Sequence, residues 1–435
     1  MKAPTVGLAT VGCKLNQYET QGLADLMESA GFQVVPFSEP ADVYIVNTCT
    51  VTSRSDSRSR QMLRRAARAN PGAVVVATGC YAQRDAEALG AMPEVALVAG
   101  NSDKGRVAAL VGEILSARKP PRVAVGPMAS AAFEALDIRR FRGHSRAFVK
   151  IQDGCDRRCA YCAVPDARGP ERSRPFADVV LQAERLAASG HREVVLTGVH
   201  IGAYRSPGGG LTELLRALVA VEGLERVRLG SLEPRELTPE LASAITSLDR
   251  VAKHLHVPLQ SGSDGVLAAM GRDYTREGYV AAVRSVTDRA ATCGLGADVM
   301  VGFPGETDRD FDDTLALVRD LPFTYLHVFA FSPRSGTEAA ARTGRVPPAV
   351  KRARSRELRE VGRRKSLEFR RSLVGSTLDV LVEGAAGAGL VSGLSSNYVR
   401  LTFSGEQALA GRIVAVRVDR ADGVLTWGTA LGERP

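Results

Sequence analysis

The sequence lacks any uninterrupted apolar run of 18 residues or more, which excludes a candidate membrane-spanning helix. Its first 19 residues also lack the cationic stretch, apolar run and small-residue cleavage site of a secretory signal. We therefore expect a cytoplasmic protein with no membrane partner. With 435 residues, 45% of them hydrophobic and 24% charged, the chain has a globular composition and a length that suits roughly two to three domains.

The seven cysteines do not form the pattern of a disulfide framework, because their number is odd and they are spread over a long chain. Metal binding or catalysis is the better interpretation. Six of them fall into two sets of three, one dispersed and one compact: Cys13, Cys49 and Cys80, and Cys155, Cys159 and Cys162. Cys293 lies outside both sets, near an expected helix end, and we expect it to be a buried structural thiol.

Positive charge is concentrated in two segments. The formal net charge is +9, yet residues 54–68 alone carry +5 and residues 345–371 carry +8, so the rest of the chain is slightly acidic. Such concentration suits a polyanion such as RNA, although a solvated helix face explains either segment taken alone. Residues 372–435 hold five Arg and no Lys against six acidic residues, so this segment is not itself basic.

The amino-terminal part alternates β-rich and helical patterns. Strands are predicted at 5–10, 42–48 and 73–79, and helices at 17–30, 56–69 and 103–116. This alternation predicts a doubly wound α/β domain with a parallel sheet. The first three cysteines each follow one of these strands, and the carboxyl ends of parallel strands share one edge, so the three are expected to converge. Residues 117–135 have the Pro-, Gly- and Ala-rich composition of a linker.

A second alternating series follows. Strands are predicted at 146–152, 193–198, 226–231, 254–259, 295–302 and 323–331, with helices that include 176–189, 211–221 and 307–319. Six such repeats predict a partial (β/α)6 barrel whose site lies at the strand carboxyl ends. A basic helix over 347–371 and five short strands after Gly375 follow, and the strands predict a small antiparallel β-barrel. We expect domains at 1–117, 141–371 and 372–435, with a linker over 118–140.

The compact cysteine set has the spacing C-x3-C-x2-C and directly follows the first barrel strand. Three thiolates can hold three irons of a cubane cluster and leave the fourth iron open for a small molecule. A zinc site would need a fourth ligand, and His144 and His191 are available only through tertiary contact.

These residues resemble the radical S-adenosylmethionine (SAM) methylthiotransferase family. The resemblance rests on the cysteine spacing with Tyr161 before the third cysteine, and on six further motifs: GCKLNQYE (12–19), NTCTVT (47–52), TGCYAQ (78–83), RG (168–169), QSGS (260–263) and GFPGET (302–307). The carboxyl-terminal segment resembles the TRAM domain of the same enzymes. The similarity extends over nearly the whole chain.

The resemblance implies two [4Fe–4S] clusters and S-adenosylmethionine. Cys155, Cys159 and Cys162 would bind the cluster that chelates S-adenosylmethionine, and the dispersed set would bind an auxiliary cluster. Further cofactor contacts are implied for the residues Tyr161, Thr197, Gly198, Glu233, His256 and Gln260. The turn at Thr197 reads TGVH and lacks the acidic residue often found there, so His200 is either a hydrogen-bond donor or a loop residue without a role.

The implied reaction is sulfur insertion into an unactivated C–H bond, for which a radical from a cofactor is the plausible route. One S-adenosylmethionine would supply a methyl group and a second the radical, with an electron donor such as flavodoxin or ferredoxin. The motifs GCKLNQYET and NTCTVT with the basic segment that follows them most resemble the branch of the family that acts on N6-threonylcarbamoyladenosine beside the tRNA anticodon, so this nucleoside is the implied substrate. Isopentenyladenosine in tRNA, a ribosomal-protein aspartate, and a non-catalytic iron–sulfur or zinc RNA-binding protein are the alternatives.

Overall fold

The computed structural model describes residues 3–118, 122–129, 133–134 and 136–433. The chain forms two compact units. Unit 1 comprises residues up to 139 together with 150–174 and 332–340, and unit 2 comprises 140–149, 175–331 and the chain from 341 onward. None of the described helices is long and apolar enough to span a membrane.

Unit 1 is built on a six-stranded parallel sheet with the order β2-β1-β3-β4-β5-β6. Its strands are β1 (Thr5–Thr10), β2 (Gln33–Val35), β3 (Val43–Thr48), β4 (Val74–Gly79), β5 (Leu97–Ala99) and β6 (Val123–Ala124). The three predicted strands are confirmed as β1, β3 and β4. The short β2, β5 and β6 were not predicted, and β6 lies within the segment interpreted as a linker. The strand order reverses between β1 and β3, which is where ligands bind in open α/β sheets.

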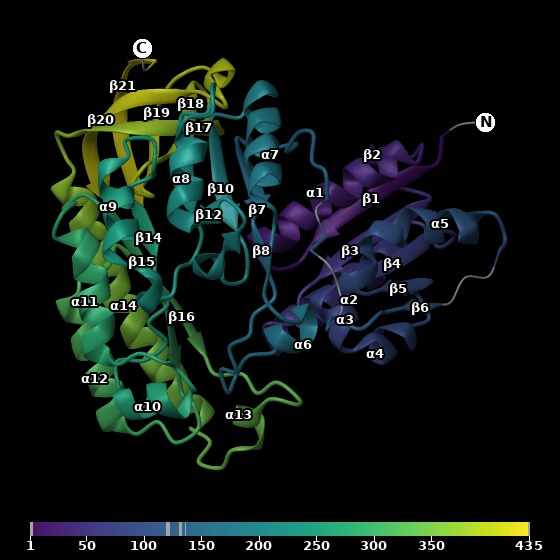
Figure 1. Ribbon diagram of the computed structural model, residues 1–435, viewed down its shortest axis with the longest axis horizontal. Helices are drawn as coiled ribbons and strands as arrows, with labels where there is room; N and C mark the ends of the chain where they lie inside the picture. Colours follow the sequence, from purple (N-terminus) through teal and green to yellow (C-terminus); the bar gives the residue numbers. More distant parts are fainter. Residues whose placement is uncertain (1–2, 119–121, 130–132, 135, 434–435) are drawn as a thin grey trace. The chain divides into compact units, whose positions relative to one another are not determined.

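Helices cover both faces of this sheet, as expected for a doubly wound domain (Figure 1). On one face, α1 (Lys14–Ser29) and α5 (Val107–Leu115) pack Leu23, Met27 and Leu110 on β-branched strand residues. On the other face lie α2 (Ser53–Ala69), α3 (Cys80–Arg84) and α4 (Ala86–Gly90). Burial of each large apolar side chain contributes about 1.5–3 kcal/mol to the stability of the fold. The two apolar layers therefore hold the sheet in place, and with it the edge where the cysteines lie.

Residues 150–174 also belong to unit 1. They contain β8 (Gln152–Asp153), the cysteine segment 155–162, α6 (Val164–Arg168) and β9 (Arg172–Ser173), which pairs with β8. The short helix α13 (Glu338–Ala341) begins in the third segment of this unit, where the Ala339 amide donates to the Ala160 carbonyl. Both cysteine sets are therefore parts of one compact unit.

Unit 2 contains the six predicted barrel strands in sequential order. β7 (Arg146–Lys150), β10 (Glu193–Thr197) and β13 (Arg226–Leu229) form one sheet, and β14 (His254–His256), β15 (Gly294–Val301) and β16 (Tyr325–Ala330) form another. Parallel bridges, one of them between Ser231 and His256, join the two sheets into a partial barrel. The main helices are α7 (Phe176–Ala188), α8 (Leu211–Val219), α9 (Pro239–Ser247), α10 (Asp264–Ala269), α11 (Arg276–Thr287) and α12 (Asp308–Asp320).

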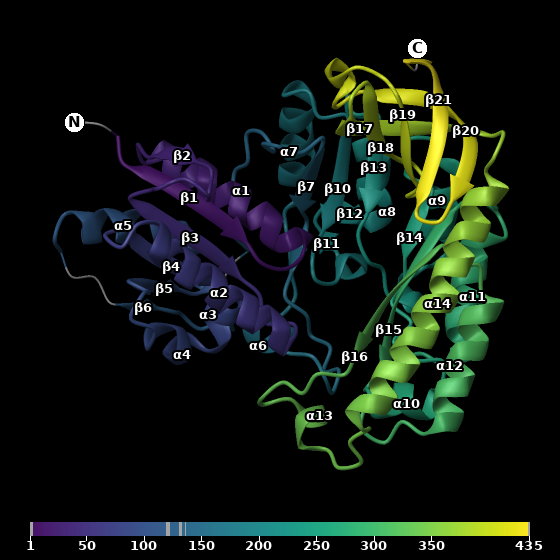
Figure 2. The same ribbon diagram turned by 180° about the vertical axis from the view of Figure 1, so that it is seen from behind.

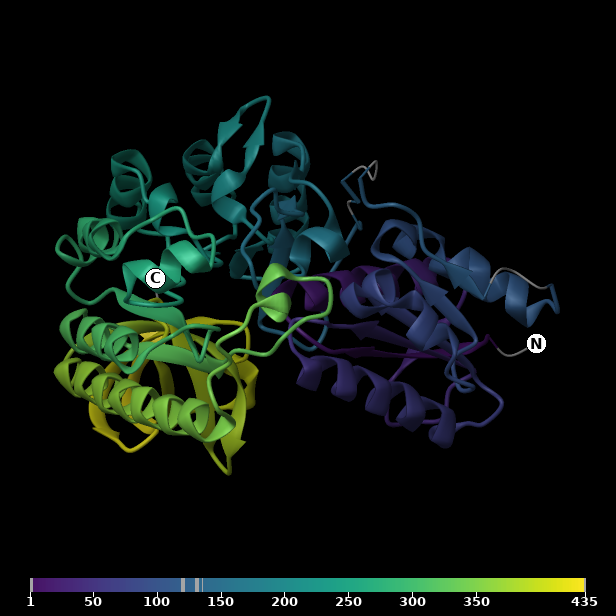
Figure 3. The ribbon, with the colours of Figure 1, turned by 90° about the horizontal axis from the view of Figure 1, so that it is seen from below.

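The predicted basic helix is α14 (Pro348–Ser372), which lies along β16 in Figure 2. After it, a closed barrel has the order β17-β18-β19-β21-β20. Its strands are β17 (Thr377–Gly387), β18 (Leu390–Ser395), β19 (Arg400–Ser404), β20 (Ile413–Asp422) and β21 (Leu425–Glu433). The barrel is antiparallel as predicted, except that β19 and β21 pair in parallel. In Figure 3 its yellow strands lie beside the yellow-green α14.

Buried arginines attach this closed barrel to the rest of unit 2. Arg226 Nη2 donates to the Asp379 carbonyl at 2.8 Å, and Arg228 Nη2 donates to the Ser395 carbonyl at 2.9 Å. Both guanidinium groups also bind the carboxylate of Glu193, which is fully buried on β10. Hydrogen bonds from buried side chains therefore join the residues before and after the domain boundary expected at 372.

Candidate functional site

The three dispersed cysteines meet at the carboxyl edge of the unit 1 sheet. Cys13 follows β1, Cys49 follows β3, and Cys80 begins α3 directly after β4. Burial, together with the nearby Cys80 and Cys13 thiolates, raises the pKa of the Cys49 thiol to about 11. Since β1, β3 and β4 are parallel neighbours, the three cysteines lie at one sheet edge, as the positions of the strands predicted.

Two glycines allow this close approach. Gly12 has a φ of 122°, and a Cβ there would lie 2.8 Å from the Cβ of Cys49 and 3.1 Å from its sulfur. Gly79 has a φ of 97°, and a Cβ there would lie 2.5 Å from the Thr48 carbonyl oxygen. Any other residue would be both strained and overlapped at these positions. The glycine before Cys13 and the glycine before Cys80 thus shape the cysteine site.

The compact cysteine set lies in the turn before α6. The Cys155 amide donates to the Gly169 carbonyl at 3.0 Å, and the Cys162 amide donates to the Cys159 carbonyl at 2.9 Å. The Val164 amide donates to the Cys162 sulfur at 3.4 Å. The three cysteines and Tyr161 are partly exposed, in a segment that these backbone hydrogen bonds hold.

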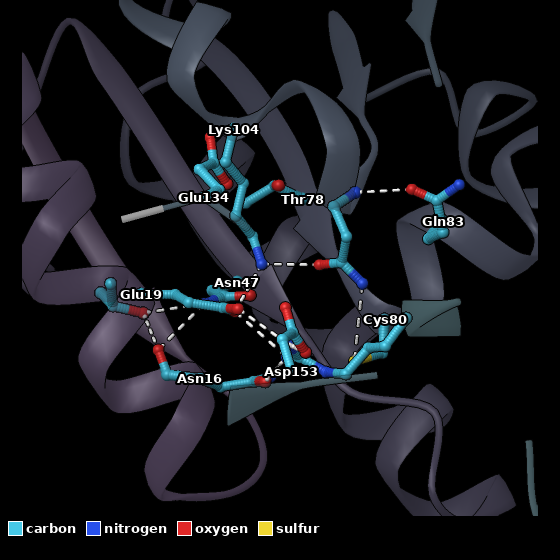
Figure 4. Close-up of polar contacts among 12 residues, drawn as sticks. Asn16, Glu19, Asn47, Thr78, Cys80, Gln83, Lys104, Glu134 and Asp153 are labelled. Atoms are coloured by element: carbon cyan, nitrogen blue, oxygen red, sulfur yellow. Dashed lines mark hydrogen bonds and ion pairs between the residues drawn. The ribbon is translucent and has the colours of Figure 1, made fainter. Parts of the chain in front are cut away.

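A buried network of charged side chains connects the two cysteine segments, and the sequence analysis did not identify it. Arg168 Nη1 lies 2.8 Å from Glu19 Oε1 and 3.0 Å from Asp153 Oδ1. Lys150 Nζ lies 2.7 Å from Asp153 Oδ2, and Lys104 pairs with Glu19. Each of these five residues is at most 5% exposed. Figure 4 shows Glu19, Asp153 and Lys104 together, with Cys80 nearby.

The carboxylates of this network are held in their charged form. Burial alone would raise the pKa of Asp153, but the cations of Lys150 and Arg168 hold that pKa well below its ordinary value. The pKa of Glu19 is lowered in the same way, by Arg168, Lys104 and Lys150 against the effect of burial. The network is therefore ionic at neutral pH.

Among the predicted cofactor contacts in unit 2, Gln260 has the most unusual structure. It follows β14 with a φ of 60°, a left-handed conformation that is rare for a residue with a side chain. Its side chain is buried, and its Oε1 atom has no hydrogen-bond partner within the described part of the chain. Backbone strain with an unpaired buried oxygen is typical of a ligand-binding position.

The other predicted contacts in unit 2 have protein partners. His256 lies 3.3 Å from Asp298 Oδ1 and 3.0 Å from the Tyr325 hydroxyl, and Glu233 pairs with Arg272. Thr197 is buried at the end of β10, and Gly198 follows it. These contacts are all within the protein, and the cofactor roles of the four residues stay predictions.

Three further residues considered earlier, His200, His191 and Cys293, have the following surroundings. His200 pairs with Glu236, and His191 Nε2 accepts a hydrogen bond from the Phe141 amide at 3.1 Å. Cys293 lies in the turn before β15, beyond the helix end where it was expected, and burial raises the pKa of its thiol. The expectation of a buried Cys293 is confirmed.

The donor sets suit iron–sulfur clusters better than single zinc ions. Tetrahedral zinc, about 2.3 Å from each sulfur, would hold the sulfurs roughly 3.8 Å apart. Among the described residues, neither set has all three sulfurs within 4.8 Å of one another. Three cysteines without a fourth nearby thiol match a cluster with one iron free of protein ligands.

Comparison with known proteins supports this interpretation. Residues 5–100 match the profile of Uncharacterized protein family UPF0004, and residues 149–318 match that of the Radical SAM superfamily. A Bacillus subtilis protein named threonylcarbamoyladenosine tRNA methylthiotransferase MtaB is 36% identical over 424 residues, covering 96% of this chain and 94% of the relative. A Moorella thermoacetica protein named tRNA-2-methylthio-N(6)-dimethylallyladenosine synthase is 37% identical over 434 residues, covering 97% of each.

Among solved structures, the fold is similar to that of TsrM from Kitasatospora setae, a radical S-adenosylmethionine methyltransferase solved with cobalamin and a [4Fe–4S] cluster. The TM-score is 0.60 at 17% identity, over 90% of this chain and 81% of TsrM. The matched family models and the two relatives together define a radical SAM enzyme. The chain belongs to the radical SAM methylthiotransferase family. Membership of this family implies a [4Fe–4S] cluster and S-adenosylmethionine as cofactors.

Proposed function

We propose that this enzyme adds a methylthio group to C2 of N6-threonylcarbamoyladenosine at position 37 of tRNA. The observation that carries the proposal is the presence in unit 1 of two separate three-cysteine sets, one at a sheet edge and one in the C-x3-C-x2-C turn. Methylthiotransfer needs a site for the cofactor that generates a radical and a second site that carries sulfur. Relatives named for threonylcarbamoyladenosine, at 36% and 39% identity, support this substrate.

The chain's own residues supply binding and placement. Cys155, Cys159 and Cys162 would hold the first cluster, and Cys13, Cys49 and Cys80 an auxiliary cluster. With S-adenosylmethionine these groups supply methyl transfer and one-electron chemistry. Tyr161, Thr197, Gly198, Glu233, His256 and Gln260 would contact the cofactor, and the unpaired oxygen of Gln260 is an acceptor for one of its donor groups.

Two exposed arginine surfaces would contact tRNA phosphates, one on α2 and one on α14. On α2 the exposed residues include Arg54, Arg58 and Arg65, and on α14 they include Arg352 and Arg356. Not all of the basic residues are available for RNA. Arg354 is buried against Glu306 and Asp308, and Arg370 donates to the carbonyl of Leu425 in the closed barrel. Only part of the charge predicted for RNA binding therefore faces solvent.

Each region of the chain would have its own part in this function. Residues 1–117 would form the auxiliary-cluster domain, 118–140 a linker, 141–371 the radical SAM domain and 372–435 a TRAM-like RNA-binding domain. A protein reductant such as flavodoxin or ferredoxin would supply electrons. The anticodon stem-loop presents unstacked bases, which are the usual target of specific RNA recognition.

The test is anaerobic reconstitution followed by assay with S-adenosylmethionine, dithionite and tRNA that carries N6-threonylcarbamoyladenosine. Iron and sulfide are counted first, and about eight irons per chain are expected for two four-iron clusters. The tRNA is then digested and its nucleosides are analysed by mass spectrometry for the methylthio product. About four irons per chain would contradict the auxiliary cluster.

N6-dimethylallyladenosine is the second candidate substrate, because the Moorella thermoacetica relative named for it is 37% identical over nearly its whole length. Product on dimethylallyladenosine tRNA alone would select this branch, and product on neither tRNA would direct the search to a ribosomal-protein aspartate. A non-catalytic iron–sulfur RNA-binding regulator would not cleave S-adenosylmethionine reductively, so methionine release in the same assay would exclude it.

A further inference from the structure

We propose that Asn101 and Arg168 are positioning residues for the sulfur of Cys80. Asn101 gives this sulfur a hydrogen-bond donor, and Arg168 carries a buried positive charge next to Ala167, whose carbonyl the same Asn101 amide binds. Together they set the reduction potential and retention of the auxiliary cluster. The inference rests on the proposed function, because it requires that Cys13, Cys49 and Cys80 hold a cluster.

The orientation of the Asn101 amide is determined by its neighbours. Lys104 Nζ lies 2.6 Å from Asn101 Oδ1, and an ammonium group can only donate. The amide nitrogen must therefore point the other way, where Nδ2 donates to the Ala167 carbonyl at 2.7 Å and to Cys80 Sγ at 3.8 Å. The Asn101 backbone amide is also held, by Gln83 Oε1 at 2.7 Å.

Arg168 is held from several directions within the same unit. Its Nη2 atom donates to Asn16 Oδ1 at 3.0 Å, and the Cys13 thiol lies 3.8 Å from the same oxygen. Glu19 and Asp153 bind its Nη1 atom. A continuous series of contacts thus leads from the Cys13 sulfur through Asn16, Arg168, Glu19, Lys104 and Asn101 to the Cys80 sulfur.

Arg168 is fixed by the charged groups around it. Its guanidinium group lies between the carboxylates of Glu19 and Asp153, and Lys104 and Lys150 bind the same two carboxylates. Figure 4 shows Glu134 beside Lys104 as a further carboxyl group. Arg168 is only 2% exposed, so its positive charge is held in the protein interior.

Charge and hydrogen bonds to sulfur are two of the factors that set the potential of an iron–sulfur cluster. Reduction adds a negative charge, so a donor to Cys80 and a buried cation in the same network favour the reduced form. These interactions are strong because Asn101 and Arg168 are themselves buried, where the local dielectric constant is low. Removal of either group should shift the potential to a more negative value and speed the loss of iron.

The experiment uses the full chain with Cys155→Ala, Cys159→Ala and Cys162→Ala, so that any cluster belongs to the dispersed set. Into this background we would introduce Asn101→Asp, which keeps the shape but removes the Nδ2 donor, and Arg168→Gln. Arg106→Gln is the matched control, because Arg106 is 66% exposed, pairs with Asp103, and ends the short 3-10 helix η1 (Asn101–Arg106) that begins at Asn101. Potentials are measured by electron paramagnetic resonance at poised voltages, and iron retention by release to a chelator.

We expect more negative potentials and several-fold faster iron release for Asn101→Asp and Arg168→Gln, with Arg106→Gln unchanged. Control-like values for both variants would overturn the inference. No iron in the background protein would instead overturn the auxiliary cluster. If Arg168→Gln lowers the melting temperature of the cluster-free protein, Arg168→Lys and Asn101→Asp decide: the lysine variant is expected to keep the potential close to that of the background.

Discussion

Glu193 offers a sharp test of the polar interior of unit 2. This carboxylate is 0% exposed on β10 and accepts Arg228 Nε at 2.7 Å and Arg226 Nη1 at 3.0 Å. Glu193→Gln keeps the shape but leaves two buried guanidinium groups without their counter-ion. Breaking a buried ion pair from one side costs about 3–5 kcal/mol. The total free energy of unfolding of a typical domain is only about 5–15 kcal/mol, so this loss would be a large part of it.

The matched control is Glu225→Gln, which removes a carboxylate 3.4 Å from Arg192 where both side chains are about one-third exposed. A surface pair of this kind contributes about 0–1 kcal/mol. The assay is urea unfolding followed by the fluorescence of Trp427, the single tryptophan of the chain, which lies on β21 of the closed barrel. Equal shifts of the unfolding midpoint for the two variants would refute the reasoning.

The same comparison has a pH dependence of known sign. Burial would raise the pKa of Glu193, but Arg228 and Arg226 lower it below its ordinary value. Its stabilising contribution is therefore complete above the unfolded pKa of about 4.3 and is lost as the pH falls through the lower folded value. The stability difference between the wild type and Glu193→Gln should be constant from pH 7 to 5 and shrink below pH 4.

Three further substitutions test the site. Gly12→Ala meets a φ of 122° and the Cys49 side chain, so iron per reconstituted chain should fall by about half, from about eight to about four; an unchanged count would contradict the packing argument. Gln260→Ala removes the unpaired buried acceptor and should weaken S-adenosylmethionine binding about tenfold by equilibrium dialysis, the value of one hydrogen bond. Arg352→Glu with Arg356→Glu, both exposed on α14, should weaken tRNA binding and flatten its salt dependence; an unchanged salt slope would remove α14 from the RNA-binding surface.

Sequence patterns predicted the long elements well because each has a strong signal. β3 and β4 are fully buried runs and β1 is partly buried, and each strand is followed by a cysteine. The position of each cysteine after its strand sufficed to predict the shared edge. The strands β2, β5 and β6 have only two or three residues, too few for a periodic pattern. Helix α1 begins at Lys14, three residues before its predicted start. Its N-cap residue, Cys13, makes no side-chain cap, so the sequence carries no capping signal at the true start of the helix.

The charged network could not be predicted, because its members are far apart in the sequence. Glu19, Lys104 and Arg168 are ordinary surface residue types, and nothing in their spacing indicates burial. The basic run on α14 was interpreted as a single surface, whereas Arg354 and Arg370 point into the protein. One local signal was available: Gly-Cys pairs occur at 12–13, 79–80 and 154–155, and a glycine before a ligand often marks a close approach of the backbone.

The way the closed barrel is attached has a consequence for protein engineering. Three guanidinium groups donate hydrogen bonds to backbone carbonyls of residues beyond 372; they belong to Arg226, Arg228 and Arg370. A chain truncated at residue 371 would expose these guanidinium groups and disturb the buried ion pairs of Glu193. A loss of activity in such a chain would therefore not measure the loss of RNA contacts alone. Chimeras that exchange this barrel between relatives should carry the three arginines with it.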